Sequence, residues 1–453
     1  MVTPFGRLVG MIAVGLAVAP SCGGSAGAQV EPRAVDVVRA RFVTIRSHGS
    51  YRAWTNLDEG VALQQAQTGI VGPFTGQLVA VKDNIDLDWL TTSGGAIALK
   101  GRHPRRNATV IDRLLAAGAI IPGHTNMDTW ARGVRTVSET LGATANARNP
   151  RLGPMGSSGG TAVAVALGDA DVGLGTDTCG SIRYPAAANL LYGLRPTPGV
   201  ISRSGIVPLS PTQDVVGPIG PTVASLAVVL DVIGGPDPRD PLTAAAPIRQ
   251  RTYTDELAQA SSGALPSRAW RVGVVRSLGT YRRDSKGKTM LDRVRDSGIA
   301  AVEVSVPALP VASVIDIESK VTRPLVLAGA DERSWLTPEG IGKAVKAAER
   351  AGEFERLRAA RSVVRARLLD LMDTNRLDAL VYPTTPFLPA ERGAPQRSAN
   401  CHLAATGGLP ALAVPHGLDA NNVPVPGVDL LGRPFHEDTL LALAQRLERT
   451  VRA

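Results

Sequence analysis

The stretch from residue 155 to residue 185 constrains this chain more than any other part, because it sets glycines around two serines. Ser157 lies in the run MGSSGG, and Ser181 directly follows Gly180. Glycine adopts backbone conformations that other residues avoid, so we expect both serines on tight turns that present their hydroxyls. Between them, TAVAVALG is typical of a short helix and DVGLGTD of a buried strand. Such a loop, helix, strand and loop brings the chain back near its starting point, which predicts that the two serines are neighbours.

Two motifs in this stretch and one upstream lysine form a recognisable set. The first motif is GSSGG at residues 156–160, the second is DTCGSIRYP at residues 177–185, and Lys82 lies in LVAVKDNI. In these features, and in the spacing of the serines, the chain resembles the amidase signature hydrolases. It departs from their pattern at Met155, where relatives usually have glycine, and at Cys179, where they have a small residue. Both departures could change the shape of the site.

The resemblance implies catalysis by three residues. Ser181 would be the nucleophile and Lys82 the base, with Ser157 relaying the proton and carrying the cis peptide bond found in relatives. A serine hydroxyl is a weak nucleophile until a neighbouring base takes its proton. Backbone N–H groups just before Ser181, with that of Ser181 itself, could stabilise the developing oxyanion, and water would then release the acyl group. These oxyanion-hole candidates belong to Thr178, Cys179 and Gly180.

Other residues of the motifs are expected to support or line the site. Ser158, Asp177 and Arg183 would hold the loops, while the Cys179 thiol would only pack. His124 replaces a lysine of the family and could contact substrate, although a structural histidine at the surface is the more common case. The candidate substrate-binding residues are Met127, Met155 and Arg203. The residues expected to order neighbouring loops or to belong to a cap are Arg195, Asp214, Glu318 and Trp335.

Lys82 follows an apolar run, LVAV, that is typical of a buried strand. A lysine at the end of such a strand can lose its solvation, which lowers its pKa and allows a neutral amine. The alternative is a lysine whose ammonium reaches the surface. Because the relay from Ser157 needs a neutral amine, we expect activity to rise toward alkaline pH.

The resemblance implies an α/β fold with a central, twisted, mixed β-sheet covered by helices on both faces in a single large domain. It covers residues 70–235 well and 375–450 moderately. We therefore expect a catalytic domain over residues 29–453, with the core motifs at 76–235 and a variable cap at about 300–375. The local patterns predict a helix over 34–45 and a helix that turns into a strand over 108–121. They also predict strands over 270–276 and 379–383, one or two long helices over 343–373, and two strands before a final helix.

Residues 1–28 have the pattern of a secretory signal peptide. Arg7 supplies a positive charge, residues 8–19 are apolar but too few to span a bilayer, and Ala26 and Ala28 frame a cleavage site. A lipoprotein anchored at Cys22 is the weaker alternative. We therefore expect an exported protein, periplasmic or secreted. The two remaining cysteines make no disulfide framework, so free thiols are the default expectation.

Charge and histidine spacing favour neither a nucleic-acid partner nor a metal. The net charge is +9, but the basic residues are scattered without interleaved aromatics, which is typical of a solvated basic surface. The six histidines show no ligand spacing. We expect no cofactor, a small amide or carbamate substrate, no stable membrane insertion, and a monomer or homodimer.

Two other functions fit parts of the sequence. Gly156, Ser158 and Gly160 also match the nucleophile elbow of Ser-His-Asp esterases, with His416 or His436 as the later histidine. A non-catalytic binding protein on the same scaffold would be expected to lack a triad residue, and all three are present. A component of an amidotransferase that works on aminoacyl-tRNA is disfavoured by the export signal. Small aryl or alkyl amides rank first as substrates, with carbamates and urethanes as further candidates.

Overall fold

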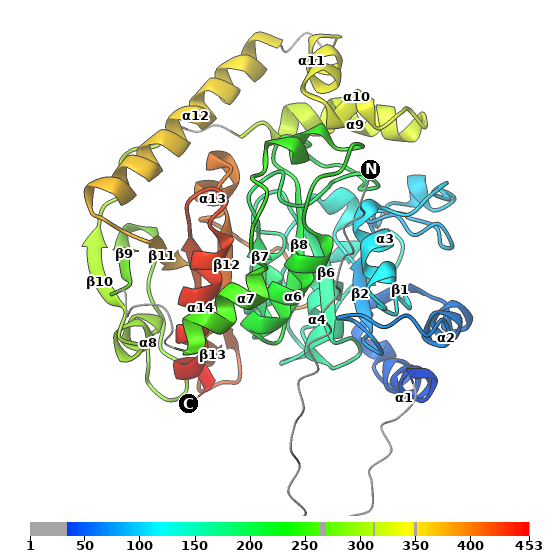
Figure 1. The fold of residues 1–453 in the computed structure, drawn as a ribbon, viewed down its shortest axis with the longest axis horizontal. Coiled ribbons are helices and arrows are strands. Elements are labelled where there is room, and N and C mark those ends of the chain that lie inside the picture. The colour runs from blue at the N-terminus through cyan, green and yellow to red at the C-terminus, as the bar shows by residue number, and fades with distance from the viewer. Residues whose placement is uncertain (1–33, 263–268, 311–312, 348–350, 453) are drawn as a thin grey trace, which may run out of the picture.

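A mixed sheet of 11 strands runs through the molecule (Figure 1). The computed structural model describes residues 34–262, 269–310, 313–347 and 351–452. The strand order is β1-β3-β2-β6-β8-β7-β12-β15-β11-β9-β10. The strands are β1 (Trp54–Leu57), β2 (Val79–Lys82), β3 (Gly123–Thr125), β6 (Val172–Asp177), β7 (Tyr192–Arg195), β8 (Val215–Gly220), β9 (Arg271–Val275), β10 (Ala300–Val304), β11 (Ala379–Pro383), β12 (Ala411–Val414) and β15 (Val428–Leu431).

Strand direction decides which residues meet at one edge of this sheet. β2 runs parallel to both β3 and β6, and β9 runs parallel to β10 and β11, whereas the remaining neighbours are antiparallel. The carboxyl ends of parallel strands lie at the same edge. Lys82, the last residue of β2, and Asp177, the last residue of β6, therefore reach the same edge of the sheet.

Alternation along the strands separates two apolar layers. In β2, Val79 and Val81 belong to the larger core cluster, whereas Ala80, together with Leu78 just before the strand, belongs to a second cluster on the opposite face. The helices that contribute to the larger cluster are α3 (Thr109–Ala116), α6 (Val223–Ile233), α7 (Tyr253–Ser262), α8 (Met290–Asp296) and α14 (Glu437–Arg452). The helices on the other face are α1 (Ala34–Ser47), α2 (Glu59–Gln67), α4 (Gly159–Ala166), α5 (Arg183–Ala188) and α13 (His402–Gly407). The expected mixed sheet with helices on both faces is therefore confirmed.

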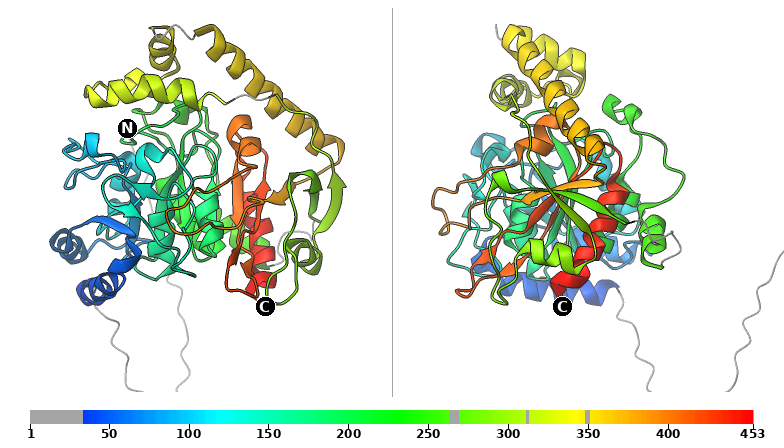
Figure 2. Two further views of the ribbon diagram at one scale, coloured as in Figure 1. Left: turned by 180° about the vertical axis from the view of Figure 1, so that it is seen from behind. Right: turned by 90° about the vertical axis from the view of Figure 1, so that its left-hand side faces the viewer.

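Helices between β10 and β11 lie across one end of the sheet (Figures 1 and 2). They are α9 (Ile315–Leu327), α10 (Arg333–Leu336), α11 (Pro338–Ala347) and α12 (Ala351–Thr374). The C-terminal part of α12 packs Val364, Leu368 and Met372 against β11 and α13. The remaining short elements are β4 (Val137–Ser138), β5 (Gly142–Ala143), β13 (Gly417–Leu418) and β14 (Pro424–Val425), with 3-10 turns η1 (Gly49–Tyr51), η2 (Ile97–Leu99), η3 (Thr129–Ala131), η4 (Pro241–Ala245) and η5 (Arg276–Leu278).

Most of the expected elements are present with small shifts at their ends. The helix expected over 34–45 is α1, the strand over 379–383 is β11, and the long helical region over 343–373 forms two helices, α11 and α12. After α3 the chain does not pass straight into a strand. Ile120 makes only an isolated bridge to Leu78, and β3 begins at Gly123.

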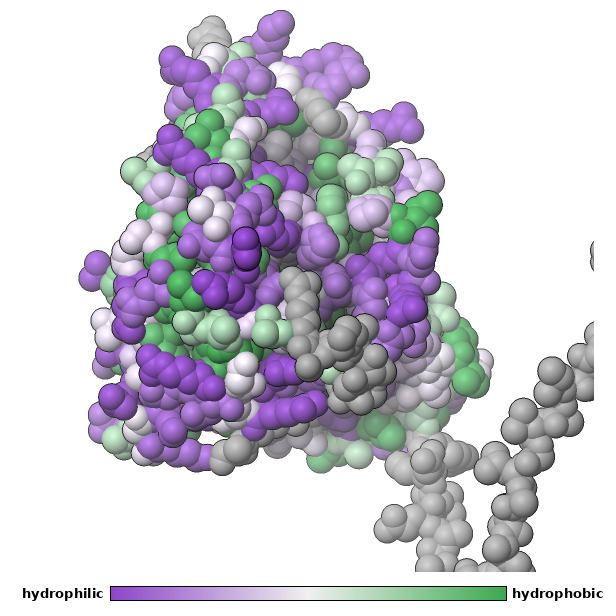
Figure 3. Space-filling model, turned by 60° about the vertical axis from the view of Figure 1, so that its left-hand side comes forward, coloured by the Kyte–Doolittle hydropathy of each residue, from purple (hydrophilic) through white to green (hydrophobic). Residues whose placement is uncertain are grey.

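The N-terminal segment and the surface complete the description. The signal peptide expected at residues 1–28 lies outside the described residues. Among the residues that the structure describes, no helix combines the length and the apolar character needed to cross a bilayer. Figure 3 shows a face on which hydrophilic and hydrophobic residues are interspersed.

Helix α4 lies so close to its neighbours that one position requires glycine. A Cβ built on Gly160 would stand 2.4 Å from the carbonyl oxygen of Asn126 and 2.6 Å from that of Ala53. These are backbone atoms, which cannot move aside as a flexible side chain would. By contrast, a Cβ on Gly342 in α11 would meet nothing within 4 Å.

We predict that G160A destabilises the protein, because overpacking in a filled core costs about 1–3 kcal/mol. The matched helical variant G342A should leave the melting temperature unchanged or raise it, since alanine favours helix by about 0.5–1 kcal/mol. Differential scanning fluorimetry of both variants measures the difference. Equal melting temperatures for the two variants would contradict the close approach of α4 to Asn126.

Candidate active site

Lys82 lies at the end of β2 with its side chain fully buried. Its Nζ donates hydrogen bonds to Ser157 Oγ at 2.8 Å and to Thr176 Oγ1 at 2.8 Å. Burial lowers the pKa of Lys82 to about 7, although the carboxylates of Asp128, Asp214 and Asp177 act in the opposite direction. The amine therefore loses its proton near neutral pH, as the buried-strand pattern predicted.

The GSSGG loop reaches Lys82 from the N-terminal end of α4. The peptide bond between Gly156 and Ser157 is cis, as the resemblance implied. Gly175 in β6 has no side chain to obstruct this approach, since a Cβ there would stand 2.8 Å from Ser158 Oγ. The backbone N–H of Ser158 donates to the carbonyl oxygen of Ser181 at 3.1 Å. The two serine loops are therefore in direct contact, as predicted.

Asp177 organises the loop that carries Ser181. Its Oδ1 accepts the backbone N–H of Gly180 at 2.7 Å, so this N–H is directed at a carboxylate rather than at open space. Within the described part of the chain, the N–H groups of Thr178, Cys179 and Ser181 have no protein acceptor. Of the expected oxyanion-hole groups, those of Thr178 and Cys179 remain open in this structure, together with that of Ser181.

Two buried arginines hold Asp177 in place. Arg183 Nε donates to Asp177 Oδ2 at 3.0 Å, and Arg195 Nη1 donates to Asp177 Oδ1 at 3.1 Å. Arg183 also pairs with Asp429 of β15. Burial alone would raise the pKa of Asp177, but the two guanidinium groups outweigh it and keep the pKa below its usual range. The expectation that Asp177 and Arg183 hold the loop agrees with these contacts.

The same loop is also held by Gln213 and Asp214, the two residues that precede β8. Asp214 Oδ1 accepts the hydroxyl of Thr178, and Gln213 Nε2 donates to the carbonyl oxygen of Thr178 at 3.4 Å. Arg195 Nη2 donates to the carbonyl oxygen of Gln213 at 2.8 Å. These contacts agree with the loop-ordering roles expected of Arg195 and Asp214.

The expectation of free thiols is wrong. Cys179 and Cys401 form a disulfide across 222 residues of sequence. The bond ties the loop before Ser181 to the residue that precedes α13. Sequence reasoning missed it because two cysteines so far apart show no spacing pattern, and only the fold brings their Cα atoms to 4.9 Å.

Two site residues were not singled out from the sequence. Thr176 accepts hydrogen bonds from both Lys82 and Asn84 through its hydroxyl. Asp128 accepts the backbone N–H groups of Arg135 and Thr136 at 2.9 and 2.8 Å, and burial raises its pKa. Their signal in the sequence was position alone, since Thr176 precedes Asp177 and Asp128 follows the GHTN run.

The candidate substrate-binding residues all have internal partners. Met127 packs with Ala131 and Leu209 and has no exposed surface. Met155 also has none; it packs against Tyr184 and, with φ of 59°, adopts the left-handed conformation that favours glycine. Arg203 is paired with buried Asp240 and lines a different cavity. These contacts favour supporting roles for the three residues over direct contact with substrate.

His124 is not a surface histidine as expected. It is fully buried, its Nε2 lies 2.8 Å from the carbonyl oxygen of Ile85, and its Nδ1 lies 3.5 Å from Asp83 Oδ1. Glu318 and Trp335 are buried as well, which agrees with packing inside the cap region. Glu318 accepts hydrogen bonds from Ser210 and Thr212.

The esterase alternative requires a histidine beside Ser158, and among the described residues no histidine is bonded to its hydroxyl. The Ser158 hydroxyl donates to the carbonyl oxygen of Thr176 at 3.3 Å and accepts its N–H at 3.4 Å. His416 is bonded to the carbonyl oxygen of Lys288, and His436 is exposed. This geometry favours Ser158 as a support of the site.

Among the described residues, one group could supply three ligands to a metal ion. It consists of Cys179, Cys401 and His402, whose ligand atoms lie within 4.8 Å of one another. Both sulfurs are already joined in the disulfide, and a metal ligand must be a thiolate. The group does not fit a metal in this state.

We predict that the number of alkylated cysteines rises by two when the denatured protein is reduced before treatment with iodoacetamide. The cross-link closes a long loop, so the double variant C179S/C401S should unfold with a free energy lower by about 2–4 kcal/mol. Intact mass spectrometry and chemical unfolding measure the two effects. An equal number of alkylated thiols before and after reduction would contradict the disulfide.

Comparisons with known proteins agree with this geometry. The family model described as Amidase matches residues 39–441. One subunit of the glutamyl-tRNA(Gln) amidotransferase from Chloroflexus aurantiacus is 34% identical, covering 92% of this chain and 93% of the relative. The corresponding subunit from Deinococcus radiodurans is 35% identical, with 93% and 92% covered.

A solved structure resembles the chain over nearly its whole length. The native peptide amidase from Stenotrophomonas maltophilia has a TM-score of 0.75 and 30% sequence identity, covering 93% of this chain and 94% of that one. The residues that the family model matches include the sheet, both serine loops and Lys82. This chain therefore belongs to the amidase family of hydrolases that act on C–N bonds.

Proposed function

We propose that this protein is an exported amidase that hydrolyses small aryl or alkyl amides through an acyl-enzyme on Ser181. The observation that carries the proposal is the 2.8 Å hydrogen bond from Lys82 to Ser157, in a loop that is itself bonded to the backbone of Ser181. A buried amine that becomes neutral near pH 7 is suited to accept a proton through a serine. Carbamates and urethanes are further candidate substrates.

The reaction proceeds in two halves. Ser181 Oγ attacks the amide carbonyl carbon while its proton passes to Ser157 and the Ser157 proton passes to Lys82. The N–H groups of Thr178, Cys179 and Ser181 bind the oxyanion. The proton returns through Ser157 to the leaving nitrogen, the C–N bond breaks and an amine departs. Water then attacks the acyl-enzyme by the same relay, and a carboxylic acid and free Ser181 result.

Two observations support export. The N-terminal residues have the pattern of a signal peptide, with a basic residue, an apolar run and small residues in sequence. Disulfides form and persist mainly in oxidising compartments, and the Cys179–Cys401 bond is adjacent to the proposed nucleophile. Both agree with a periplasmic or secreted enzyme.

The curated relatives favour a second candidate function, that of one component of an amidotransferase. Two proteins named as subunits of glutamyl-tRNA(Gln) amidotransferase are 34% and 35% identical over more than nine-tenths of the chain. On this alternative the amide would be that of glutamine, and the chain would act with partner proteins. Hydrolysis of glutamine compared with hydrolysis of an anilide, each by the isolated chain, distinguishes the two candidates.

We predict that S181A and K82A each lower kcat/KM for 4-nitroacetanilide by about 10³-fold or more, because each removes a group of the relay. S158A is the matched control, and it should retain most activity because its hydroxyl contacts only the backbone of Thr176. Release of 4-nitroaniline measures all three variants. An inactive S158A beside an active K82A would instead support the esterase alternative.

The pKa of Lys82 predicts the pH dependence. Because the relay needs the neutral amine and the pKa is lowered to about 7, kcat/KM should rise about tenfold per pH unit below pH 7 and level off above it. Initial rates of anilide hydrolysis measured between about pH 5 and about pH 9 show whether kcat/KM rises and then levels off in this way. A rate that still rises tenfold per unit up to pH 9 would mean that Lys82 keeps the pKa of an exposed lysine, which would contradict the proposed base.

A further inference from the structure

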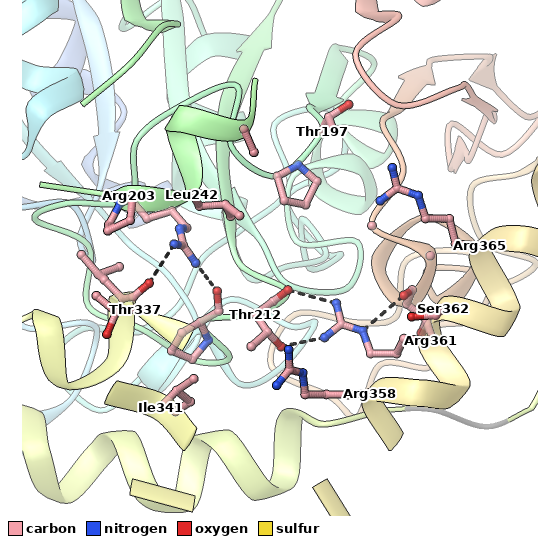
Figure 4. Close-up of a pocket in the computed structure, with 18 of the residues that line it drawn as sticks. Thr197, Arg203, Thr212, Leu242, Thr337, Ile341, Arg358, Arg361, Ser362 and Arg365 are labelled. Carbon is pink, nitrogen blue, oxygen red and sulfur yellow. Dashed lines mark hydrogen bonds between the residues drawn. The ribbon is translucent and has the colours of Figure 1, made fainter. Parts of the chain in front are cut away.

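A cavity is lined in part by Pro211 and Thr212, which lie just before the Gln213 and Asp214 that bond to Thr178. It has a volume of about 600 Å³ and is bounded by α12, by the α10–α11 region and by loops that follow β7 and precede β8 (Figure 4). Its lining includes neither Lys82 nor the serines of the relay. It is therefore a separate site from the one described above.

The lining of this cavity carries an excess of positive charge. Four arginines contribute to it and no carboxylate does; the arginines are Arg203, Arg358, Arg361 and Arg365. Three of them lie on one face of α12, because positions spaced by three and four residues share a face of a helix. Figure 4 shows Arg358, Arg361 and Arg365 with Ser362 along one side of the cavity, and Arg203 on the other side.

The four arginines differ in how far their charge is already neutralised. Arg203 is paired with Asp240, and Arg358 lies 3.4 Å from Glu355 at an exposed position. Arg361 donates to the hydroxyl and carbonyl oxygens of Thr212.

Arg365 is different. Among the residues that the structure describes, it has no hydrogen-bond or ion-pair partner, although it is half-buried. A half-buried guanidinium without an acceptor can bond an incoming anion without giving up an existing partner.

The rest of the wall is largely apolar. The residues that provide it include Pro198, Leu242, Leu336, Ile341 and Phe435. Cavities of this size hold small organic molecules, in which a few polar groups fix the orientation of an apolar body. A bare inorganic anion would leave most of this wall without contact.

We propose that this cavity binds an organic carboxylate with an apolar body of about the size of a phenylalkanoate, with the carboxylate at Arg365. Arg361 connects the cavity to the candidate site, because it holds Thr212 while the next two residues, Gln213 and Asp214, bond to Thr178. The cavity therefore shares Thr212 with the segment that holds Thr178. Its binding is measured without turnover, so the result is independent of the proposed hydrolysis.

The test is isothermal titration of the full chain with 4-phenylbutyrate, and with 4-phenyl-1-butanol as the matched neutral probe. We expect saturable binding of the carboxylate and binding at least about tenfold weaker for the alcohol, as a charge-assisted hydrogen bond implies. R365Q should weaken carboxylate binding about tenfold or more, whereas R365K should retain most of it. The control is R356Q, an exposed arginine of the same helix that does not line the cavity.

The controls also separate this cavity from the catalytic site, which could itself bind a carboxylate. Binding there would not depend on Arg365. Equal affinities of R365Q and R356Q, equal binding of acid and alcohol, or no saturable binding up to about 10 mM would each overturn the proposal. Inorganic phosphate that binds as tightly as 4-phenylbutyrate would also overturn it, because the apolar wall would then contribute nothing. Circular dichroism melting of R365Q and R365K checks that both variants fold.

Discussion

The burial of one lysine is the constraint on which the site depends. Removing an unpaired ammonium from water costs several kcal/mol. Because this cost falls on the charged form, burial lowers the pKa of Lys82 to about 7. Among the residues that the structure describes, no carboxylate is bonded to Nζ; its partners are the hydroxyls of Ser157 and Thr176 and the carbonyl oxygen of Thr176. A direct salt bridge would have held the proton on the amine. The choice of hydroxyl partners at this buried position is therefore what makes the lysine usable as a base.

Charged side chains lie near Lys82, but they bond to the loop that precedes Ser181 and to one another. Asp177 lies between Arg183 and Arg195, and Arg183 continues to Asp429 on a distant strand. Buried ion pairs add little net stability, but they tolerate few geometries because each guanidinium fork must meet its carboxylate. The same loop is also held by the disulfide to Cys401, by a hydrogen bond that Gln213 donates to it and by one that Asp214 accepts from it. The loop is positioned by its surroundings rather than by its own short sequence.

The sequence predicted the features that depend on local pattern and on the family motifs. The apolar run from Leu78 to Val81 placed Lys82 at the end of a buried strand, and the glycine-framed serines were correctly expected to be neighbours. The features that it missed depend on contacts between distant segments. Nothing local to Cys179 indicates Cys401, and nothing local to His124 indicates burial against Ile85 and Asp83.

Glycine at the oxyanion loop shows a different limit of sequence reasoning. A motif names the residue that precedes the nucleophile, but not the acceptor of its N–H. In the structure that acceptor is Asp177, three residues earlier, and the same carboxylate also meets both arginines. The motif residues Asp177, Gly180 and Arg183 thus form one hydrogen-bonded unit. The sequence alone had predicted an oxyanion role for Gly180 and a separate, loop-holding role for Asp177 and Arg183.

Several of the arginines that give the chain its positive net charge are buried and do not lie at the surface. Scattered arginines predicted a solvated basic surface, yet Arg183 and Arg195 are fully buried and Arg203 nearly so. Arginine suits such positions because its planar group makes several directed hydrogen bonds and stays charged where a lysine would lose its proton. Lys82 and these arginines therefore have different roles as buried basic residues. The arginines remain charged and fix the geometry, while the lysine, with no acid in hydrogen-bond contact, is left free to exchange a proton.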